Sequence, residues 1–357
     1  MIATHPVQSN LLWSREPGLA AWPLEWQRPA RTEEWAWEQW VQAAPTTRFA
    51  QLLAFPWATL IDLLDRGHSD RARPMLAALD AAPISTTLIR ATVCQHIRMP
   101  ALLPRFRALG ITDVFWAHAR VGDPSLDGVR IHPFPLFPVR CHDNPSAASD
   151  PTPLAARSLL YSFVGAYAPE GYLTPVRQWI FDLPPQPNAL VQRRADWHYE
   201  PQVYGEQVGG RSMTDDERRR TAERGAEYDR TLLDSVFSLC PSGSGPNSIR
   251  LWESLGFGCI PVLLADTLRL PGEPAEWDEA IVRVSETREA VAGLPALLSR
   301  LAADPERLAR MRQAGRRLWQ RYGERGPLEV LGVLGDTGWV RSQVAPGRVP
   351  ITQAETA

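Results

Sequence analysis

The chain has 357 residues and a formal net charge of −2. This length suits two α/β domains of similar size better than a single core. The near-neutral charge supplies no overall field that would attract a polyanion, so nucleic acid is not an expected partner. All 38 basic residues are arginine. The absence of lysine excludes a Walker A phosphate loop and pyridoxal phosphate chemistry, because each requires a lysine amine.

The cysteines and the N-terminal segment indicate the cellular compartment in which the protein is expected. The four cysteines lie far apart without a CxxC pair, which favours buried thiols over disulfides or a zinc site. A signal-peptide pattern and a bilayer-spanning apolar stretch are both absent from the sequence, so we expect a cytoplasmic protein. Seven tryptophans between Trp13 and Trp57 could contact a membrane surface, which leaves a peripheral position at the inner membrane open. Irregular packing of this segment onto the first domain is the favoured interpretation.

The first half of the chain contains one clear βαβ pattern. Strand-like residues 88–94 are followed by a helical stretch that ends at Gly110 and by a second strand-like run, 111–118. The segment from Pro133 to Pro153 is rich in proline and small polar residues, which disfavour helices and central strands. We therefore predict a first, Rossmann-like domain over residues 1–150.

Alternation of strands and helices resumes after this boundary. Strands are predicted over 158–167, near 188–193, over 235–240 and over 259–266, with helices over 174–181, 246–257 and 286–322. A long polar helix begins at Thr214, whose side chain can form a capping box with Glu217. The predicted second domain covers residues 151–330, and the tail 331–357 is expected to be partly disordered.

The segment from Phe237 to Asp266 has the layout of a phosphate-binding site. Gly243 and Gly245 lack Cβ atoms, so the loop after the strand can turn tightly and bring its N–H groups close to a ligand. Pro246 suits the first turn of the next helix, because it has no N–H to lose. The N–H groups that follow would face an anion at the positive helix end.

Side chains of the same helix could complete this site. Asn247 and Ser248 lie at its start, Ser248 adds a hydroxyl, and Arg250 adds a guanidinium that can bind phosphate oxygens in pairs. Glu253 follows about one turn later, where a carboxylate could reach the ribose of a bound nucleotide. Ser248 stands where the GxGxxG fingerprint requires its third glycine, so a nicotinamide enzyme is disfavoured.

At this point the sequence resembles a known family, the exostosin family of inverting glycosyltransferases, glycosyltransferase family 47. The resemblance covers Arg157 to about Tyr322. It is carried by RSLLYSFVGAY, by EYDRTLLDSVFSLCPSGSGPNSIRLWESLGFGCIPVLLAD, by LPGEPAEWDEAIVRVSE and by LARMRQAGRRLWQRY. The first half of the chain resembles the family only in a βαβ core around TVCQHI and DVFWAH. Acceptor choice is expected to lie there.

The resemblance implies an α/β fold of the GT-B type, with two Rossmann-like domains facing each other across a cleft. A UDP-sugar would bind to the second domain, and a glycan or lipid-linked glycan acceptor would enter across the cleft. A bacterial enzyme of surface-polysaccharide assembly is the implied function.

Residue roles can be carried over from the family only position by position. The loop Ser242–Ser248, with Gly243, Gly245 and Asn247, would hold the diphosphate together with Arg250, and Glu253 would hold the ribose. Arg157 and Arg177 match basic positions that could add charge at the leaving group, and Asp266 would contact sugar hydroxyls or cap the next turn.

An inverting transfer also needs a base that takes the acceptor proton. His96 and His118 are the candidates, because each follows a predicted strand of the first domain and a histidine titrates near neutral pH. Asp123, Asp113 and Glu16 remain alternatives. The sequence has no compelling DxD triplet, so neither a metal nor another cofactor is predicted.

Other functions remain open. A GT-B nucleotide-sugar epimerase would share the fold and the nucleotide site. A catalytically idle protein could bind a nucleotide-sugar or glycan in support of another transferase. A phosphorylase of the pyridoxal type is excluded by the missing lysine.

Overall fold

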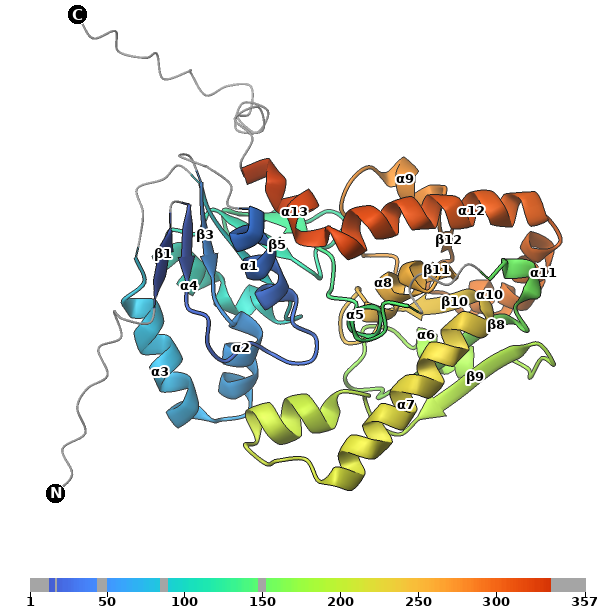
Figure 1. Cartoon of the computed structure of the whole chain (residues 1–357), viewed down its shortest axis with the longest axis horizontal. Helices are drawn as coiled ribbons and strands as arrows, with labels where there is room; N and C mark the ends of the chain where they lie inside the picture. The colour runs from blue at the N-terminus through green and yellow to red at the C-terminus, as the bar shows by residue number, and fades with distance from the viewer. Residues whose placement is uncertain (1–12, 17, 44–49, 84–88, 147–151, 335–357) are drawn as a thin grey trace, which may run out of the picture.

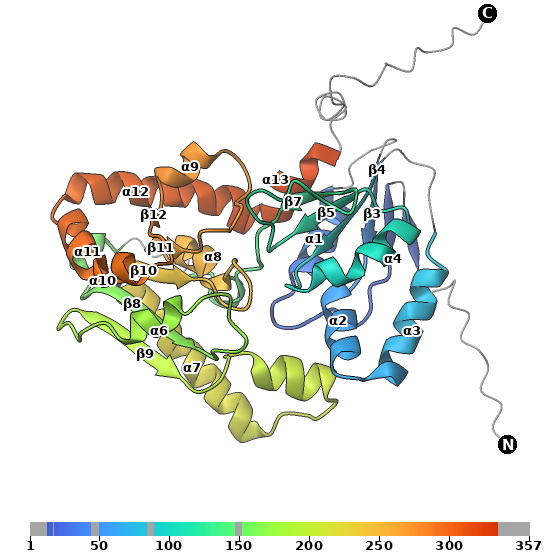
Figure 2. The ribbon, with the colours of Figure 1, turned by 180° about the vertical axis from the view of Figure 1, so that it is seen from behind.

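The computed structural model describes residues 13–16, 18–43, 50–83, 89–146 and 152–334. These residues form two α/β domains, each built on a mainly parallel sheet with helices packed around it (Figure 1). The view from behind shows the same two bodies, blue to teal for the first and green to red for the second (Figure 2). The prediction of two Rossmann-like α/β domains is confirmed.

The first domain contains a seven-stranded sheet in the order β1-β2-β3-β4-β5-β7-β6. Strands β2 to β5 and β7 run parallel, and the edge strands β1 and β6 are antiparallel to their neighbours. The strands are β1 (Ser14–Glu16), β2 (Leu19–Ala21), β3 (Ala50–Ala54), β4 (Ile89–Cys94), β5 (Asp113–Trp116), β6 (Ser125–Leu126) and β7 (Val129–Pro133). The helical segments are α1 (Thr32–Ala43), α2 (Trp57–Asp65), α3 (Ser69–Asp80), η2 (Met99–Leu102) and α4 (Leu103–Ala108). The predicted βαβ unit corresponds to β4, η2 with α4, and β5.

The second domain contains a five-stranded parallel sheet in the order β12-β11-β10-β8-β9. The strands are β8 (Leu159–Ala166), β9 (Ala189–Arg194), β10 (Ser235–Pro241), β11 (Ile260–Leu264) and β12 (Val282–Arg283). The helices are α6 (Val176–Phe181), α7 (Asp215–Asp234), α8 (Ile249–Gly256), α9 (Pro274–Asp278), α10 (Arg288–Ala292), α11 (Leu294–Ala302) and α12 (Pro305–Leu318). The capping box of Thr214 and Glu217 forms at the start of α7 as predicted. Helix α8 begins three residues later than predicted.

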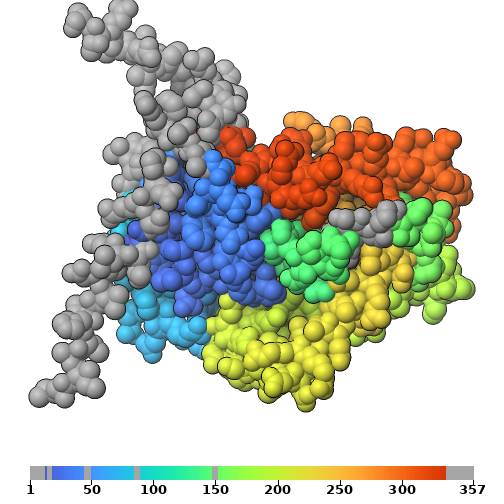
Figure 3. All heavy atoms as spheres, in the orientation of Figure 1, coloured from blue at the N-terminus to red at the C-terminus, as the bar shows by residue number. Residues whose placement is uncertain are grey.

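Three short segments join the domains. Helix α5 (Val139–Asp143), which lies inside the proline-rich segment, packs against α8 and sits between the two bodies as a green surface in Figure 3. The π-helical segment η5 (Pro201–Val208) packs against α2. After the π-helical η6 (Trp319–Glu324), helix α13 (Gly326–Leu331) and the turn η7 (Gly332–Leu334) return to the first domain, where Leu331 and Leu334 join its core. The predicted disordered tail lies outside the described residues from 335 onward.

The tryptophan-rich segment forms regular structure, so the expectation of irregular packing was wrong. Six of its seven tryptophans are buried, with 7% exposure or less, so these six rings are not available for contact with a membrane surface. They are Trp13, Trp22, Trp26, Trp35, Trp40 and Trp57. Among the described residues, no helix is both long and apolar enough to cross a membrane.

Trp57 supports the first core most directly. Its ring is fully buried, with its centroid 4.7 Å from that of Phe55 and 4.8 Å from that of Phe106, and its indole N–H donates to the Thr92 hydroxyl at 2.7 Å. We expect Trp57→Ala to lower the free energy of unfolding by about 3–5 kcal/mol. Trp197→Ala, at a position 38% exposed whose ring contacts Tyr199 and Tyr204, serves as the matched control and should lower it by about 1.5 kcal/mol or less. Denaturant unfolding of both variants measures the difference, and equal midpoints would contradict the prediction.

Candidate functional site

The carboxyl edges of the two sheets face each other. The loop after β5 pairs with the loop after β11, where Val121 N–H donates to the Thr267 carbonyl and Arg269 N–H donates to the Ala119 carbonyl, both at 2.9 Å. In the second sheet, chain order reverses between the neighbouring strands β8 and β10. Ligands of open α/β sheets bind beyond the carboxyl ends of the strands at such a reversal. The candidate site therefore lies at the ends of β8 and β10.

Two arginines converge at this point, one from α6 and one from α8. Arg177 donates to the carbonyls of Ser242 and Ala166, at 2.8 and 2.9 Å. Arg250 donates to the carbonyl of Val164 on β8 and, at 3.3 Å, to the Tyr228 hydroxyl. Its guanidinium also stacks on the Phe163 ring, 4.6 Å from the centroid.

Neither arginine has an acidic partner within the described ranges. The pKa of Arg177 is lowered to about 10, mainly by burial. Tyr172 raises this pKa, and the nearby charge of Arg250 lowers it. The two guanidiniums are held by backbone carbonyls instead of by ion pairs, so the pair keeps a concentrated positive charge that attracts an anion. This pair brings together two of the predicted donor-binding residues.

The start of α8 offers backbone N–H groups beside these arginines. Ser248 is the N-cap residue in extended conformation, without a side-chain cap. In the described part of the chain, the N–H groups of Ser248, Ile249 and Arg250 have no hydrogen-bond acceptor. The first turn of a helix with free N–H groups attracts an anion.

The preceding loop is placed by contacts with the first domain. The Asn247 carboxamide donates to the Ala117 carbonyl at 2.6 Å and accepts from Trp252 Nε1 at 3.0 Å. Asn247 is only 6% exposed, so its side chain holds the two domains together. Gly245 lies so close to the first domain that a Cβ would stand 2.4 Å from His118 Nδ1 and 2.6 Å from a methyl group of Ile97. Gly245 is therefore required for this contact.

Gly243 is required on the other side of the same loop. A Cβ there would lie 2.9 Å from an Arg177 nitrogen, so any side chain at this position would displace the arginine. Ser242, at the beginning of the loop, donates through its hydroxyl to Glu286. Through Arg177 and Glu286, Ser242 and Gly243 connect the end of β10 to α6 and to the loop after β12.

Glu286 was not predicted from the sequence. Its carboxylate accepts from the Thr174 hydroxyl at 2.8 Å and from Asp266 N–H at 3.0 Å, and Asp266 accepts from Glu286 N–H at 3.0 Å. Two carboxylates thus lie at the ends of β11 and β12, beside the arginine pair. The two-residue strand β12 gave too short a pattern to be recognised, although a carboxylate after a strand end was the available signal.

Glu253 is enclosed between α5 and α7. The residue is 3% exposed, and its carboxylate accepts from Arg140 N–H at 3.0 Å and from the Tyr228 hydroxyl. Burial raises its pKa to about 7, although these two hydrogen bonds and the charge of Arg250 lower it. Arg140 in turn binds Asp229 through two bonds of 2.8 and 2.7 Å. A ribose contact by Glu253 therefore stays a prediction.

The raised pKa of Glu253 predicts a pH-dependent stability. The folded state binds more protons than the unfolded state between pH 4.5 and about pH 7, so this carboxyl favours folding at low pH and disfavours it as the pH rises. From pH 4.5 to pH 8, the unfolding free energy of the wild type should fall relative to that of Glu253→Gln by on the order of 3 kcal/mol. Denaturant titrations at both pH values measure this. Parallel curves for the two proteins would contradict it.

The two candidate bases differ in their surroundings. His118 is 7% exposed, and burial lowers its pKa to about 3, with further lowering by His96 and Arg120. It accepts from Asn247 N–H through Nδ1 at 3.4 Å. Its ring is enclosed in the contact between the domains, where it lies against Gly245 and Asn247.

His96 lies at the end of β4 and is partly open, with its side chain 12% exposed. Its Nε2 lies 3.2 Å from Asp62 Oδ1, and Nδ1 accepts from Arg98 N–H at 3.1 Å. The backbone carbonyl of His96 accepts from Trp116 Nε1 at 2.8 Å. The structure therefore places His96 at the carboxyl edge of the first sheet with a carboxylate beside it.

Three other candidates are placed away from this site or cannot be assigned to it. Arg157 precedes β8, at the opposite edge of the sheet, and donates to the carbonyls of Leu232, Ser235 and Phe257. Asp113 begins β5 at the opposite edge of the first sheet, where hydrogen bonds from His132, Arg130 and Thr112 overcome the effect of burial and lower its pKa to about 2. Glu16 lies in edge strand β1, and its side chain is outside the described part.

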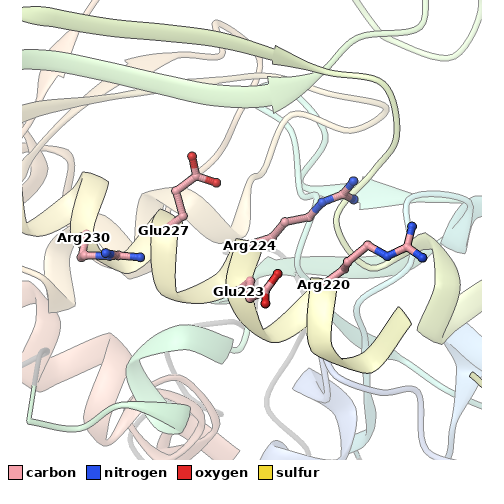
Figure 4. Close-up of a pocket in the computed structure, with 5 residues that line it drawn as sticks. All are labelled: Arg220, Glu223, Arg224, Glu227 and Arg230. Carbon is pink, nitrogen blue, oxygen red and sulfur yellow. The ribbon is translucent and has the colours of Figure 1, made fainter. Parts of the chain in front are cut away.

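Asp123 stays a candidate base, whereas two cavities of the protein lie away from this site. Asp123 lies in the loop after β5, where its N–H donates to the Arg120 carbonyl at 3.3 Å. A cavity of about 660 Å³ beside Arg157 and Arg312 occupies the opposite edge of the second sheet. Another, of about 470 Å³, is formed by exposed side chains of α7, from Arg220 to Arg230 (Figure 4). Among the described residues, no three histidine, cysteine, aspartate or glutamate side chains are grouped so that they could hold a metal ion.

Comparison with known proteins identifies the family. The model of the exostosin GT47 domain matches residues 106–299, more than half of the chain, and the chain belongs to this family. A probable glucuronosyltransferase of Oryza sativa subsp. japonica is 42% identical over 85 residues, 24% of this chain and 19% of that protein. The exostosin-1 homolog of Caenorhabditis elegans is 35% identical over 97 residues, 27% of this chain and 24% of its own length.

Further similarities are shorter or weaker. A probable glucuronoxylan glucuronosyltransferase of Arabidopsis thaliana is 45% identical over 64 residues, 18% of this chain and 14% of that protein. The chain thus spans a quarter or less of the length of these relatives. A structure of sucrose-phosphate synthase from Thermosynechococcus elongatus covers 87% of this chain and 71% of its own, at 14% identity and a TM-score of 0.32. That similarity is too low to support an inference.

Proposed function

We propose that this protein is an inverting glycosyltransferase that moves a sugar from a UDP-sugar to a glycan or lipid-linked glycan acceptor. The observation that carries the proposal is the arginine pair, Arg177 and Arg250, next to the free N–H groups at the start of α8. This arrangement suits a nucleoside diphosphate, whose negative charges need a dense set of donors. Membership of the exostosin GT47 family and the glucuronosyltransferase names of relatives support it.

The proposed reaction needs no metal or other cofactor. The acceptor hydroxyl loses its proton to His96 while its oxygen attacks the anomeric carbon of the donor. The bond between that carbon and the diphosphate breaks, and UDP leaves with the bonding electrons. Arg177, Arg250 and the helix start stabilise the charge that develops on the leaving diphosphate. Attack from the face opposite to the diphosphate inverts the anomeric configuration.

Asp266 and Glu286 lie where they could accept hydrogen bonds from donor sugar hydroxyls. Their charges would disfavour a sugar that carries a carboxylate, because like charges at close range repel. The relatives' names point the other way, to a glucuronosyl donor. A donor panel must therefore contain UDP-glucuronic acid as well as neutral UDP-sugars.

A thermal-shift screen against UDP-, GDP-, CMP- and dTDP-sugars tests the proposal, because a ligand that binds only the folded state raises the melting temperature. UDP-sugars should give the largest shifts. The best donor is then incubated with glycan acceptors, and UDP release is followed with and without acceptor. Absence of any shift with all UDP-sugars would overturn the proposal.

Two alternatives make different predictions in the same assays. A nucleotide-sugar epimerase would convert the donor without releasing UDP in an acceptor-dependent way. An idle nucleotide-sugar-binding partner of another transferase would show the thermal shift and no turnover. No contact in the site favours either over transfer.

A further inference from the structure

A buried carboxylate on α2 contacts the proposed base. Asp62 is 5% exposed, and its Oδ1 lies 3.2 Å from His96 Nε2. Its second oxygen, Oδ2, accepts from Gln27 Nε2 at 2.5 Å. Both oxygens are therefore held in place, and the carboxylate can turn in neither direction without losing a bond.

We propose that Asp62 is the positioning residue of the transfer reaction, which keeps the proton of His96 on Nε2 and thereby leaves Nδ1 to take the proton of the acceptor. This inference rests on the proposed function. A base that is oriented by a third group through a hydrogen bond is the common arrangement of activated catalytic groups.

The charge of Asp62 supports this role. Within the described residues, no arginine forms an ion pair with Asp62, and His96 is the one cationic group that can contact it. A buried carboxylate without a cationic partner is costly. When His96 accepts the proton of the acceptor hydroxyl, the resulting imidazolium gives Asp62 that partner, so the charge that appears during transfer is stabilised.

Further groups surround the pair. On α2, Asp65 forms an ion pair of 2.6 Å with the guanidinium of Arg98. Arg98 lies two positions after His96 in the chain. His118 approaches from the end of β5 and Glu33 from α1. Burial raises the pKa of Glu33 to about 8, so it is largely uncharged at neutral pH and leaves Asp62 as the carboxylate that faces His96.

A hydrogen bond from Arg98 N–H occupies Nδ1, and the same turn touches the donor loop, since a Cβ on Gly245 would meet Ile97 at 2.6 Å. Nδ1 therefore becomes available when the acceptor hydroxyl replaces the Arg98 N–H. The proton moves from that hydroxyl to Nδ1, and His96 returns it to solvent after UDP has left.

Asp62→Asn tests the inference, with Asp80→Asn, at the exposed end of α3 where Asp80 pairs with Arg105, as the control. With the best donor of the panel, kcat of Asp62→Asn should fall by about 10²-fold or more while KM for the donor changes little. Asp80→Asn should retain the wild-type kcat. In ¹⁵N-histidine NMR spectra of the free protein, with His96 assigned by His96→Gln, the wild type should carry its proton on Nε2. Asp62→Asn should show a mixture of both tautomers.

Two further variants separate positioning from a loss of folding. Asp62→Glu keeps a carboxylate and should recover part of kcat, and added formate should partly restore Asp62→Ala. A wild-type tautomer and wild-type kcat in Asp62→Asn would overturn the inference while leaving the glycosyltransferase proposal intact. A wild type that transfers no sugar but keeps the Nε2 tautomer would instead refute the proposed function.

Discussion

Replacing His96 by alanine is expected to lower kcat of sugar transfer by about 10²–10⁴-fold and to leave the affinity for UDP unchanged. The reason is the separation of the two sites. His96 lies two residues after β4 in the first domain, whereas the groups proposed to hold UDP lie at the ends of β8 and β10 in the second. Steady-state kinetics with the donor of the panel and calorimetric binding of UDP measure the two quantities separately.

His68→Ala is the control for this variant. His68 lies at the start of α3 without a side-chain capping bond, and its loss should alter neither quantity. If His96→Ala turned over at the wild-type rate, the base would have to be sought elsewhere. Asp123 would then be the remaining candidate among the described residues at this edge of the first sheet.

Arg250→Met and Arg177→Met are each expected to weaken UDP binding by roughly 10- to 150-fold. A charge-assisted hydrogen bond contributes about 1.5–3 kcal/mol, which corresponds to this range of dissociation constants. Each variant removes one of two like charges that have no acidic partner, so the diphosphate loses a binding group while the protein loses a repulsion. Calorimetric titration with UDP measures the change.

Arg193→Ala controls for the general loss of positive charge at this end of the sheet. Arg193 is exposed at the end of β9, where it stacks on Tyr167 and Phe181. Its removal should leave the dissociation constant of UDP within about twofold, because exposed charges are screened by salt. Unchanged UDP binding in both methionine variants would place the diphosphate outside this arginine pair.

Much of the second domain follows from local sequence pattern. The parallel strands, the loop with Gly243 and Gly245 and the capping box of Thr214 were predicted, because each depends on neighbouring residues or on a short period. The first domain was predicted less completely. Its opening strands are only three residues long, too short for alternation to show, and its tryptophans gave no period that distinguishes a buried face from an exposed one.

The use of each side chain was decided by the tertiary structure. Arg157 precedes β8 and Arg177 lies in the first turn of α6. Only Arg177 lies at the carboxyl edge of the sheet, because it follows β8 in the chain whereas Arg157 comes before that strand. Asn247 appeared to be a ligand-binding residue, but its partner, Ala117, comes from the other domain.

Sequence alone therefore determined the fold class and the family resemblance, and it supplied the prediction of a phosphate-binding loop, since these depend on contiguous residues. Only the folded chain brought Asp62 to His96 and Glu286 to Asp266. Contacts between residues 20 or more positions apart depend on how the sheets and helices pack, and no periodicity along one chain specifies them.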